Sequence, residues 1–242
     1  MGRLELFEYP PDWGEDGLTF MMEQAHRNRV ASFKNKPEFQ RLIGINDCFQ
    51  RVTDGWTNPE SQLAALLLIR SHSAFFAACE KAASTALADT FPHIRACLEY
   101  AAYALHIDQT PGLAETWLNR HDSDAALAAV RREFSIAKLR ASIGGRDQHA
   151  ERVFHRLYEE SIDFGAHPNE RAVTGSLEIE TTDQGREYKQ LWFHGDGQTL
   201  DYVLLSTGRP GICALQILQN VFGPRFELLG INADLLNLRQ GL

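Results

Sequence analysis

TNPESQLAALLLIRSHSAFFAACEKAASTALA, residues 57–88, decides the fold class of this 242-residue chain. Thr57 and Glu60 have the spacing of a helix-capping box, and Pro59 suits a first helical turn. The first half of the segment is apolar on nearly every helical face, which is typical of a helix at the centre of its domain. We therefore predict a central helix over about residues 60–88.

Apolar residues at helical spacing predict further helices on both sides of this central one. Pro37 suits the first turn of one of them, and Pro92 is expected to interrupt the chain directly after the central helix. The expected helical ranges are 18–34, 37–52, 92–108, a short helix after Pro111, 121–145 and 147–164.

A change of periodicity follows. Residues 176–194 alternate between apolar and polar side chains and contain a glycine-bearing turn, which predicts a β-hairpin. We expect this hairpin to pack against the helices, because an isolated hairpin is marginally stable in water. Helical periodicity returns over 198–208 and 210–222, and an amphipathic tail, 223–242, is expected to dock on the body or on a partner.

The predicted fold class is therefore mainly α: a multi-helix bundle in a single domain over residues 1–242, with the hairpin inserted near residues 176–194. Residues 1–12, with two adjacent prolines, are expected to form an extended arm.

Composition limits the classes of function. The net charge of −8 disfavours nonspecific attraction to nucleic acid by the molecule as a whole. The four cysteines lack Cys-x-x-Cys spacing and lie in apolar helical patterns, so we expect reduced thiols in a cytoplasmic protein. The longest apolar run, residues 63–69, is far below the roughly 20 residues of a membrane span, and no membrane partner is predicted.

FPHIRACLEYAAYALHI, residues 91–107, carries a narrow polar strip between two apolar faces. Arg95, Glu99 and His106 lie on this strip at helical spacing. Arg95 and Glu99 are four residues apart and can pair directly, and such a pair in a restricted setting can anchor an anion or an amide. The alternative interpretation is that the strip is the solvated side of a helix packed on both flanks.

EESIDFGAHPNERA, residues 159–172, ends a predicted helix at a glycine and places His167 before a proline. A histidine fixed there can act as acid, base or hydrogen-bond donor near neutral pH. We hypothesise that His167 forms a site with Arg95 and Glu99; the alternative is that it is a surface turn residue. The side chains expected to bind ligand around this site are Arg70, His72, Tyr103 and His106.

The motif Arg-x-x-x-Glu on an alanine-rich helix (RACLE, 95–99) is followed much later by a helix that ends in a Tyr-Glu-Glu…His-Pro run. In these motifs the chain resembles bacterial all-helical proteins of unknown function, which are similar in outline to the HEPN group, a group that includes RNA-cleaving toxins. The resemblance covers about residues 60–170. HEPN nucleases carry an Arg followed, after about four to six residues, by a His. Arg146–His149 and Arg152–His155 are too closely spaced, so the resemblance does not extend to that motif.

A basic segment, residues 131–156, gives separate support for an anionic partner. It contains seven basic and three acidic side chains, a local charge of +4 in an acidic chain, and can contact the phosphates of RNA or of a nucleotide. The alternative is a solvated helical face. No metal site and no cofactor are predicted, since the chain has one unpaired Glu-x-x-His motif and no glycine-rich phosphate loop.

Two hypotheses follow. The first is a noncatalytic helical protein that binds a partner or a small ligand, with a homo-oligomer among the options. The second is an enzyme that acts on a phosphate-bearing substrate, RNA or a nucleotide, with Arg95, Glu99 and His167 in its site. Geometry separates them: the second requires these three side chains to meet.

Overall fold

The computed structural model describes residues 9–241, so the first eight residues of the predicted N-terminal arm lie outside the described residues. Within this range the protein is mainly helical with one two-stranded antiparallel sheet, and the predicted fold class is confirmed. A π-helical turn, η1 (Ile162–Ala166), follows α8, and the strands are β1 (Leu177–Thr182) and β2 (Gly185–Gln190). The α-helices are α1 (Gly17–Asn35), α2 (Pro37–Thr53), α3 (Gln62–Ala83), α4 (Leu87–Gln109), α5 (Leu113–Leu118), α6 (Asp124–Glu133), α7 (Ile136–Gly144), α8 (Gln148–Ser161), α9 (Glu170–Thr174), α10 (Gln198–Leu228) and α11 (Ile231–Leu238).

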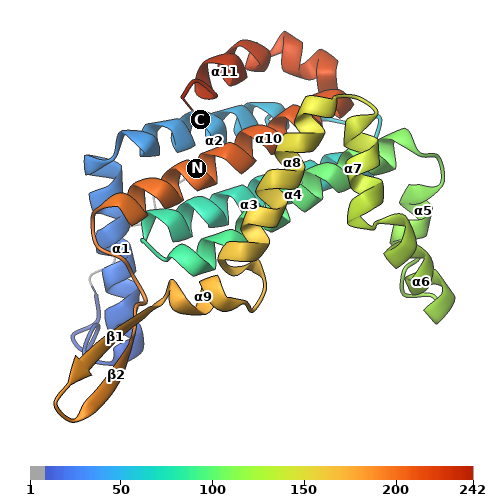
Figure 1. The fold of residues 1–242 in the computed structure, drawn as a ribbon. Coiled ribbons are helices and arrows are strands. Elements are labelled where there is room, and N and C mark those ends of the chain that lie inside the picture. The colour runs from blue at the N-terminus through green and yellow to red at the C-terminus, as the bar shows by residue number, and fades with distance from the viewer. Residues whose placement is uncertain (1–8, 242) are drawn as a thin grey trace.

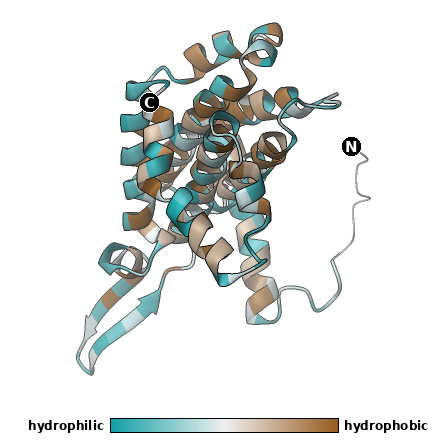
Figure 2. Ribbon diagram, turned by 90° about the vertical axis from the view of Figure 1, so that its right-hand side faces the viewer, coloured by the Kyte–Doolittle hydropathy of each residue, from teal (hydrophilic) through white to brown (hydrophobic). Residues whose placement is uncertain are grey.

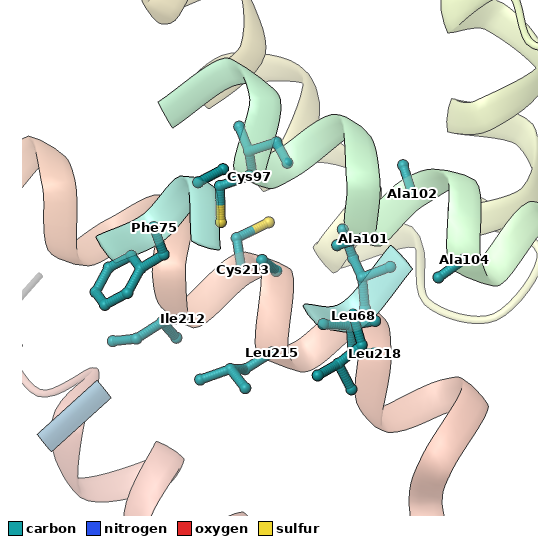
Figure 3. Close-up of a cluster of buried hydrophobic side chains, with 14 of the residues drawn as sticks. Leu68, Phe75, Cys97, Ala101, Ala102, Ala104, Ile212, Cys213, Leu215 and Leu218 are labelled. Atoms are coloured by element: carbon teal, nitrogen blue, oxygen red, sulfur yellow. The ribbon is translucent and has the colours of Figure 1, made fainter. Parts of the chain in front are cut away.

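Four long helices enclose the hydrophobic core (Figure 1). α10 contacts α2, α3 and α4, and α3 packs along α4. Buried side chains from α3, α4 and α10 meet in the centre, where alanines and cysteines allow the helices to approach closely (Figure 3). α7 and α8 pack on α4 and on each other. α3 is therefore a core helix, as its apolar sequence indicates.

Gly211, in the middle of α10, sets how closely this helix approaches α3 and α2. A Cβ atom at this position would lie 2.4 Å from Cε2 of Phe75 and 2.9 Å from Cγ2 of Ile45. Both neighbours are almost completely buried and cannot move into solvent. Only glycine fits at this crossing without displacing the core.

The ends of the central helix differ from the predicted range, 60–88. At its start the N-cap is Ser61, and Asn58, at the middle of the predicted capping sequence, has a positive φ of 47°. At its end Thr85 has a positive φ of 69°, which a right-handed helix does not contain, so α3 ends earlier than predicted. The predicted capping box of Thr57 and Glu60 is therefore wrong.

Pro92 does not interrupt the chain as predicted but lies inside α4. The chain turns earlier, between α3 and α4. Because proline has no N–H, the carbonyl of Ala88, four residues before it, receives no helical hydrogen bond from that position. The same carbonyl is contacted by η1, as described below.

Two other helical predictions need correction. Residues 121–145 form two helices, α6 and α7, which are separated at Phe134 and Ser135. Conversely, residues 198–222 form part of a single helix, α10, which contains Pro210 and bends at Phe222. Neither change affects the fold class.

The predicted hairpin is present, with Ile179 opposite Tyr188 and a two-residue loop. It projects from the helical body (Figures 1 and 2). β2 is exposed along its whole length, as is most of β1, so the prediction that the hairpin packs against the helices is wrong. Its base is anchored where the N–H of His194 donates to the carbonyl of Thr85 at 3.0 Å.

The C-terminal tail, 223–242, divides between two helices. Its first residues continue α10, and α11 packs on α2 and α10 through buried Ile231 and Leu235. A Cβ atom on Gly44 of α2 would lie 2.8 Å from Cδ2 of Leu238, so a small residue there lets α11 lie close to the body.

α3 is also the one helix in the described part of the chain whose length and composition would allow it to cross a membrane. Its contacts with α2, α4 and α10 give its apolar residues another role, because they form the core of the helical bundle.

Candidate functional site

The structure brings Arg95, Glu99 and His167 together. Nε of Arg95 donates to Oε1 of Glu99 at 2.9 Å, across one turn of α4, and its Nη1 lies 2.5 Å from Nε2 of His167. A guanidinium only donates, so His167 accepts here through Nε2 and carries its own proton on Nδ1.

Tyr158 of α8 is a fourth member that sequence reasoning missed. Its hydroxyl accepts from Nη2 of Arg95 at 2.8 Å and donates to Oε1 of Glu99 at 3.2 Å, and its ring lies 5.0 Å from the Arg95 guanidinium carbon. The available signal was the tyrosine of the Tyr-Glu-Glu…His-Pro run, because a buried tyrosine hydroxyl needs a hydrogen-bond partner. We refer to Arg95, Glu99, Tyr158 and His167 as the Arg95 cluster.

η1 places His167 over α4. A Cβ atom on Gly165 would lie 2.3 Å from the carbonyl oxygen of Ala88, so only glycine allows the turn to approach this part of α4. Beside it, the ring of Phe164 stacks on that of Phe91 with centroids 5.3 Å apart. These contacts hold η1 against the beginning of α4 and carry the following residue pair, His167 and its proline, to the Arg95 side chain.

Within the Arg95 cluster the charges and donors already satisfy one another. Burial alone would lower the pKa of Arg95, but the charge and hydrogen bond of Glu99 outweigh it and raise that pKa. Burial and then Glu99 raise the pKa of Tyr158. The Nε2 lone pair of His167, which a general base would need, is directed at Arg95. In this arrangement the cluster is a partly exposed network that joins α4, α8 and the exposed His167, which directly follows η1.

Two of the predicted ligand-binding residues, His72 and His106, have separate structural partners. Nε2 of His72 lies 2.8 Å from Oδ1 of Asn46. His106 bridges Oγ of Ser142 (2.6 Å) and the carbonyl of Glu133 (3.0 Å). Burial lowers the pKa of both imidazoles, as expected for neutral rings inside a helical body.

The other two, Arg70 and Tyr103, contact different aromatic rings. Arg70 is exposed on α3, with its guanidinium carbon 5.5 Å from the centre of the Tyr100 ring. Tyr103 packs on Phe134, and burial followed by the charge of Glu99 raises its pKa. Tyr103 is thus the one of the four that borders the Arg95 cluster.

Only part of the basic segment 131–156 is available to an anion. Three of its basic side chains pair with acidic neighbours: Arg132 and Lys138 with Glu133, and Arg140 with Glu151. Within the described residues no ion pair is formed by Arg131, Arg146, Arg152 or Arg156.

A groove of about 390 Å³ between α8 and α10 gathers one of these free arginines with two others from distant parts of the chain. We call it the α8–α10 groove. No acidic residue lines it. Its basic residues are His149 and Arg156 of α8, Arg209 of α10 and Arg239, just after α11. Its aliphatic floor consists of Val153, Leu157, Ile212 and Cys213.

The arginines of the groove have no carboxylate partner among residues 9–241. Nε of Arg209 is also buried without a hydrogen-bond partner there. Arg156 lies close enough to Cys213 to oppose the rise in its thiol pKa that burial causes. The groove therefore concentrates positive charge above an apolar surface.

A second, more polar cavity of about 840 Å³ continues from the groove, with Gln216 and Arg239 lining both. It adds Arg146 to the basic set, next to Asp147 and Glu227. Sequence reasoning identified the α8 side of this surface through the basic segment. It missed the α10 side, because no local pattern indicates that residues about 60 positions apart face one another.

No group of three or more His, Cys, Asp and Glu side chains in residues 9–241 is arranged to hold a metal ion. Comparison of the chain with protein-family models, with curated proteins and with solved structures finds no match.

Proposed function

We propose that the protein is a noncatalytic binding module for a phosphate-bearing ligand, and that the α8–α10 groove binds it. One observation carries this proposal: Arg156 of α8, Arg209 of α10 and Arg239 after α11 converge around an apolar floor, and none of them has a carboxylate partner among residues 9–241. Free guanidinium groups above an apolar surface suit a ligand that has an anionic end and a less polar body.

A nucleotide is the ligand class that these dimensions and chemistry favour. A volume of about 390 Å³ lies in the range of small-molecule sites. The phosphates would meet the arginines, and the base or sugar would lie on Leu157 and Ile212. No Phe, Tyr or Trp side chain lines either cavity in the described chain, so the large stacking platforms typical of single-stranded RNA binders are missing from this surface. An RNA with a terminal phosphate is therefore the second ligand to test.

The test is titration of the full chain with a nucleoside triphosphate, the matching nucleoside, inorganic phosphate and a short 5′-phosphorylated RNA, measured by calorimetry. We expect the triphosphate to bind and the nucleoside to bind far more weakly. Arg156→Gln combined with Arg239→Gln should weaken triphosphate binding by about 100-fold or more, because each charge-assisted hydrogen bond contributes about 1.5–3 kcal/mol and every ~1.4 kcal/mol is tenfold in affinity.

Arg152→Gln is the matched control, because Arg152 is an exposed arginine of the same helix that does not line the groove. It should leave affinity unchanged. Equal losses in the control and in Arg239→Gln alone would mean that net charge alone attracts the ligand. Absence of triphosphate binding would remove the proposal.

The second candidate function is an enzyme that cleaves RNA or hydrolyses a nucleotide at the Arg95 cluster, as the HEPN resemblance suggests. The meeting of Arg95, Glu99 and His167 is the observation that favours it. Its test is incubation of the chain with RNA and with a nucleoside triphosphate, with and without EDTA. Product formation that His167→Ala abolishes would replace the binding proposal with the enzymatic one.

The proposed setting is the cytoplasm of a bacterial cell. The four cysteines are all unpaired, and three of them are buried, which suits a reducing compartment.

A further inference from the structure

The β-hairpin presents an open edge and two chemically different faces to solvent. On one face Ile179 and Tyr188 are opposite each other, with 55% and 66% of their surfaces exposed. The other face carries Glu187 and Lys189 of β2, together with the two glutamates of β1. An exposed two-stranded sheet with an apolar face is marginal alone and offers unpaired backbone groups to another strand.

The hydrogen-bond pattern identifies which backbone groups of β2 point outward. The N–H of Leu191 donates to the carbonyl of Ser176 at 2.8 Å, and bonded pairs of an antiparallel ladder recur at every second residue. Residues 189, 187 and 185 therefore bond to β1. The N–H and C=O groups of Arg186, Tyr188 and Gln190 face away from β1, along the open edge.

We propose that this edge pairs with the same edge of a second copy of the chain, antiparallel and centred on Tyr188. The outward groups of Tyr188 then bond with those of the partner's Tyr188, and Arg186 bonds with the partner's Gln190 in both directions. The result is a four-stranded sheet in the order β1-β2-β2-β1. The contact is isologous, so it closes as a dimer.

Charge complementarity selects this register. Centred on Tyr188, the pairing sets Glu187 opposite the partner's Lys189, and Lys189 opposite the partner's Glu187. A register centred on Glu187 would oppose two glutamates and form fewer backbone bonds. One centred on Arg186 would oppose two arginines.

The edge of β1 is unsuited to the same pairing. Centred on Ile179, two β1 strands would set Glu178 opposite the partner's Glu180 twice, and like charges directly opposite destabilise a sheet. Pairing of β1 with β2 of another copy would be head-to-tail and leave edges open at both ends. The β2 edge is therefore the one that yields a closed assembly of two chains.

The experiment is sedimentation equilibrium of the full chain over a wide concentration range. The natural chain should reach twice the mass of one chain. In the Glu187→Lys variant the new lysine lies opposite the partner's Lys189 at both symmetry-related positions. This repulsion should weaken dimerisation by about tenfold or more. In the Lys189→Glu variant the new glutamate lies opposite the partner's Glu187, and dimerisation should be weakened to the same extent.

A mixture of these two single variants is the decisive measurement. One variant has lysine at both positions 187 and 189, and the other has glutamate at both. Every lysine therefore lies opposite a glutamate in a mixed pair, and the mixture should form a heterodimer although neither variant dimerises well alone. Glu115→Lys, at an exposed position on α5, makes the same change of net charge as Glu187→Lys and should leave dimerisation intact. The variant residues lie on the exposed hairpin outside the core, and helical circular dichroism will verify the fold.

A natural chain that stays monomeric at every concentration would overturn the proposal. So would a dimer that Glu187→Lys leaves unchanged, or a mixture of the two single variants that behaves as the sum of its components. Each of these outcomes can be read independently of nucleotide binding, because the hairpin contributes no residue to the α8–α10 groove.

Discussion

Single residues set how closely the helices of this molecule approach one another. The crossing of α10 over α3 leaves room for a hydrogen at position 211, because the Phe75 ring and Ile45 occupy the space that a Cβ would need. We predict that Gly211→Ala lowers the free energy of unfolding by about 1–3 kcal/mol through overpacking, despite the higher helix propensity of alanine. Urea denaturation measures this change.

Gly223 of the same helix provides the matched control for that substitution. A Cβ added there meets no atom within 4 Å. Gly223→Ala should therefore leave stability unchanged or raise it by up to about 1 kcal/mol, as helix propensity predicts. Similar losses at both positions would show that the crossing is not tight.

His106 makes the stability of the protein depend on pH. Burial lowers its pKa below the ordinary value of 6.5, and burial does the same for His72. The unfolded chain therefore binds more protons than the folded chain when the pH falls. The stability from neutral, buried imidazoles is present above about pH 6.5 and is lost progressively below it, by up to about 1.4 kcal/mol per pH unit for each histidine.

We predict that the free energy of unfolding falls as the pH is lowered below about 6.5, the ordinary pKa of histidine. His106→Asn should reduce that slope, even though it also lowers stability by removing the bridge between Ser142 and Glu133. His121→Asn, at an exposed position, should leave the slope intact. Chemical denaturation at a series of pH values gives the slope, and a pH-independent natural chain would contradict the prediction.

The residues of the Arg95 cluster could be predicted from sequence only where the pattern was local. Arg95 and Glu99 are one helical turn apart, so their pairing follows from spacing. The glycine and proline around His167 indicated a fixed turn. Tyr158 was part of the Tyr-Glu-Glu…His-Pro run, but its hydrogen-bond partners on α4 could not be predicted from that run. Arg209 and Arg239 gave no local signal, because their role depends on which helices become neighbours.

At the scale of elements, η1 is the segment that links the end of α8 to the start of α4. It docks where Pro92 leaves the Ala88 carbonyl without a helical donor, and Gly165 makes the close approach possible. We predict that Gly165→Ala displaces η1, lowers stability by about 1–3 kcal/mol and loosens the contact of His167 with Arg95. Amide hydrogen exchange should accelerate over residues 162–175.

Gly195 is the control for that prediction. It lies in the loop between the hairpin and α10, and a Cβ there meets no atom within 4 Å. Gly195→Ala should leave exchange over residues 162–175 unchanged. Equal protection in the Gly165→Ala variant and the natural chain would show that η1 tolerates a side chain at this contact.

Helix boundaries show where sequence reasoning fails for elements. Pro37 lies at the first position of α2 and Gly144 at the end of α7, as predicted, because both effects act within one turn. Pro92 was interpreted as a break, yet α4 continues through it because packing of η1 and α3 outweighs one missing hydrogen bond. The hairpin gives a second example. The alternation of apolar and polar side chains predicted its two strands, but it could not predict whether they contact the helices.

At the scale of the whole molecule, the groove opposes the overall charge. The chain has a net charge of −8, so its long-range field repels anions, while Arg156, Arg209 and Arg239 attract them locally. A phosphate ligand that binds here must therefore gain its affinity at short range. Added salt weakens such contacts, because it competes for each arginine with the ligand and screens its charge.

Salt and substitution should act on the same arginine contacts. Triphosphate affinity should fall as sodium chloride is raised, with a logarithmic slope that reports the number of arginine contacts. Arg239→Gln should reduce that slope by about one third, since it removes one of three contacts. Arg152→Gln should not, because its charge lies outside the groove. Calorimetric titrations at a series of salt concentrations measure both slopes. If the two variants had the same slope as the natural chain, the triphosphate would be bound by groups other than the groove arginines, and the positive charge between α8 and α10 would need another explanation.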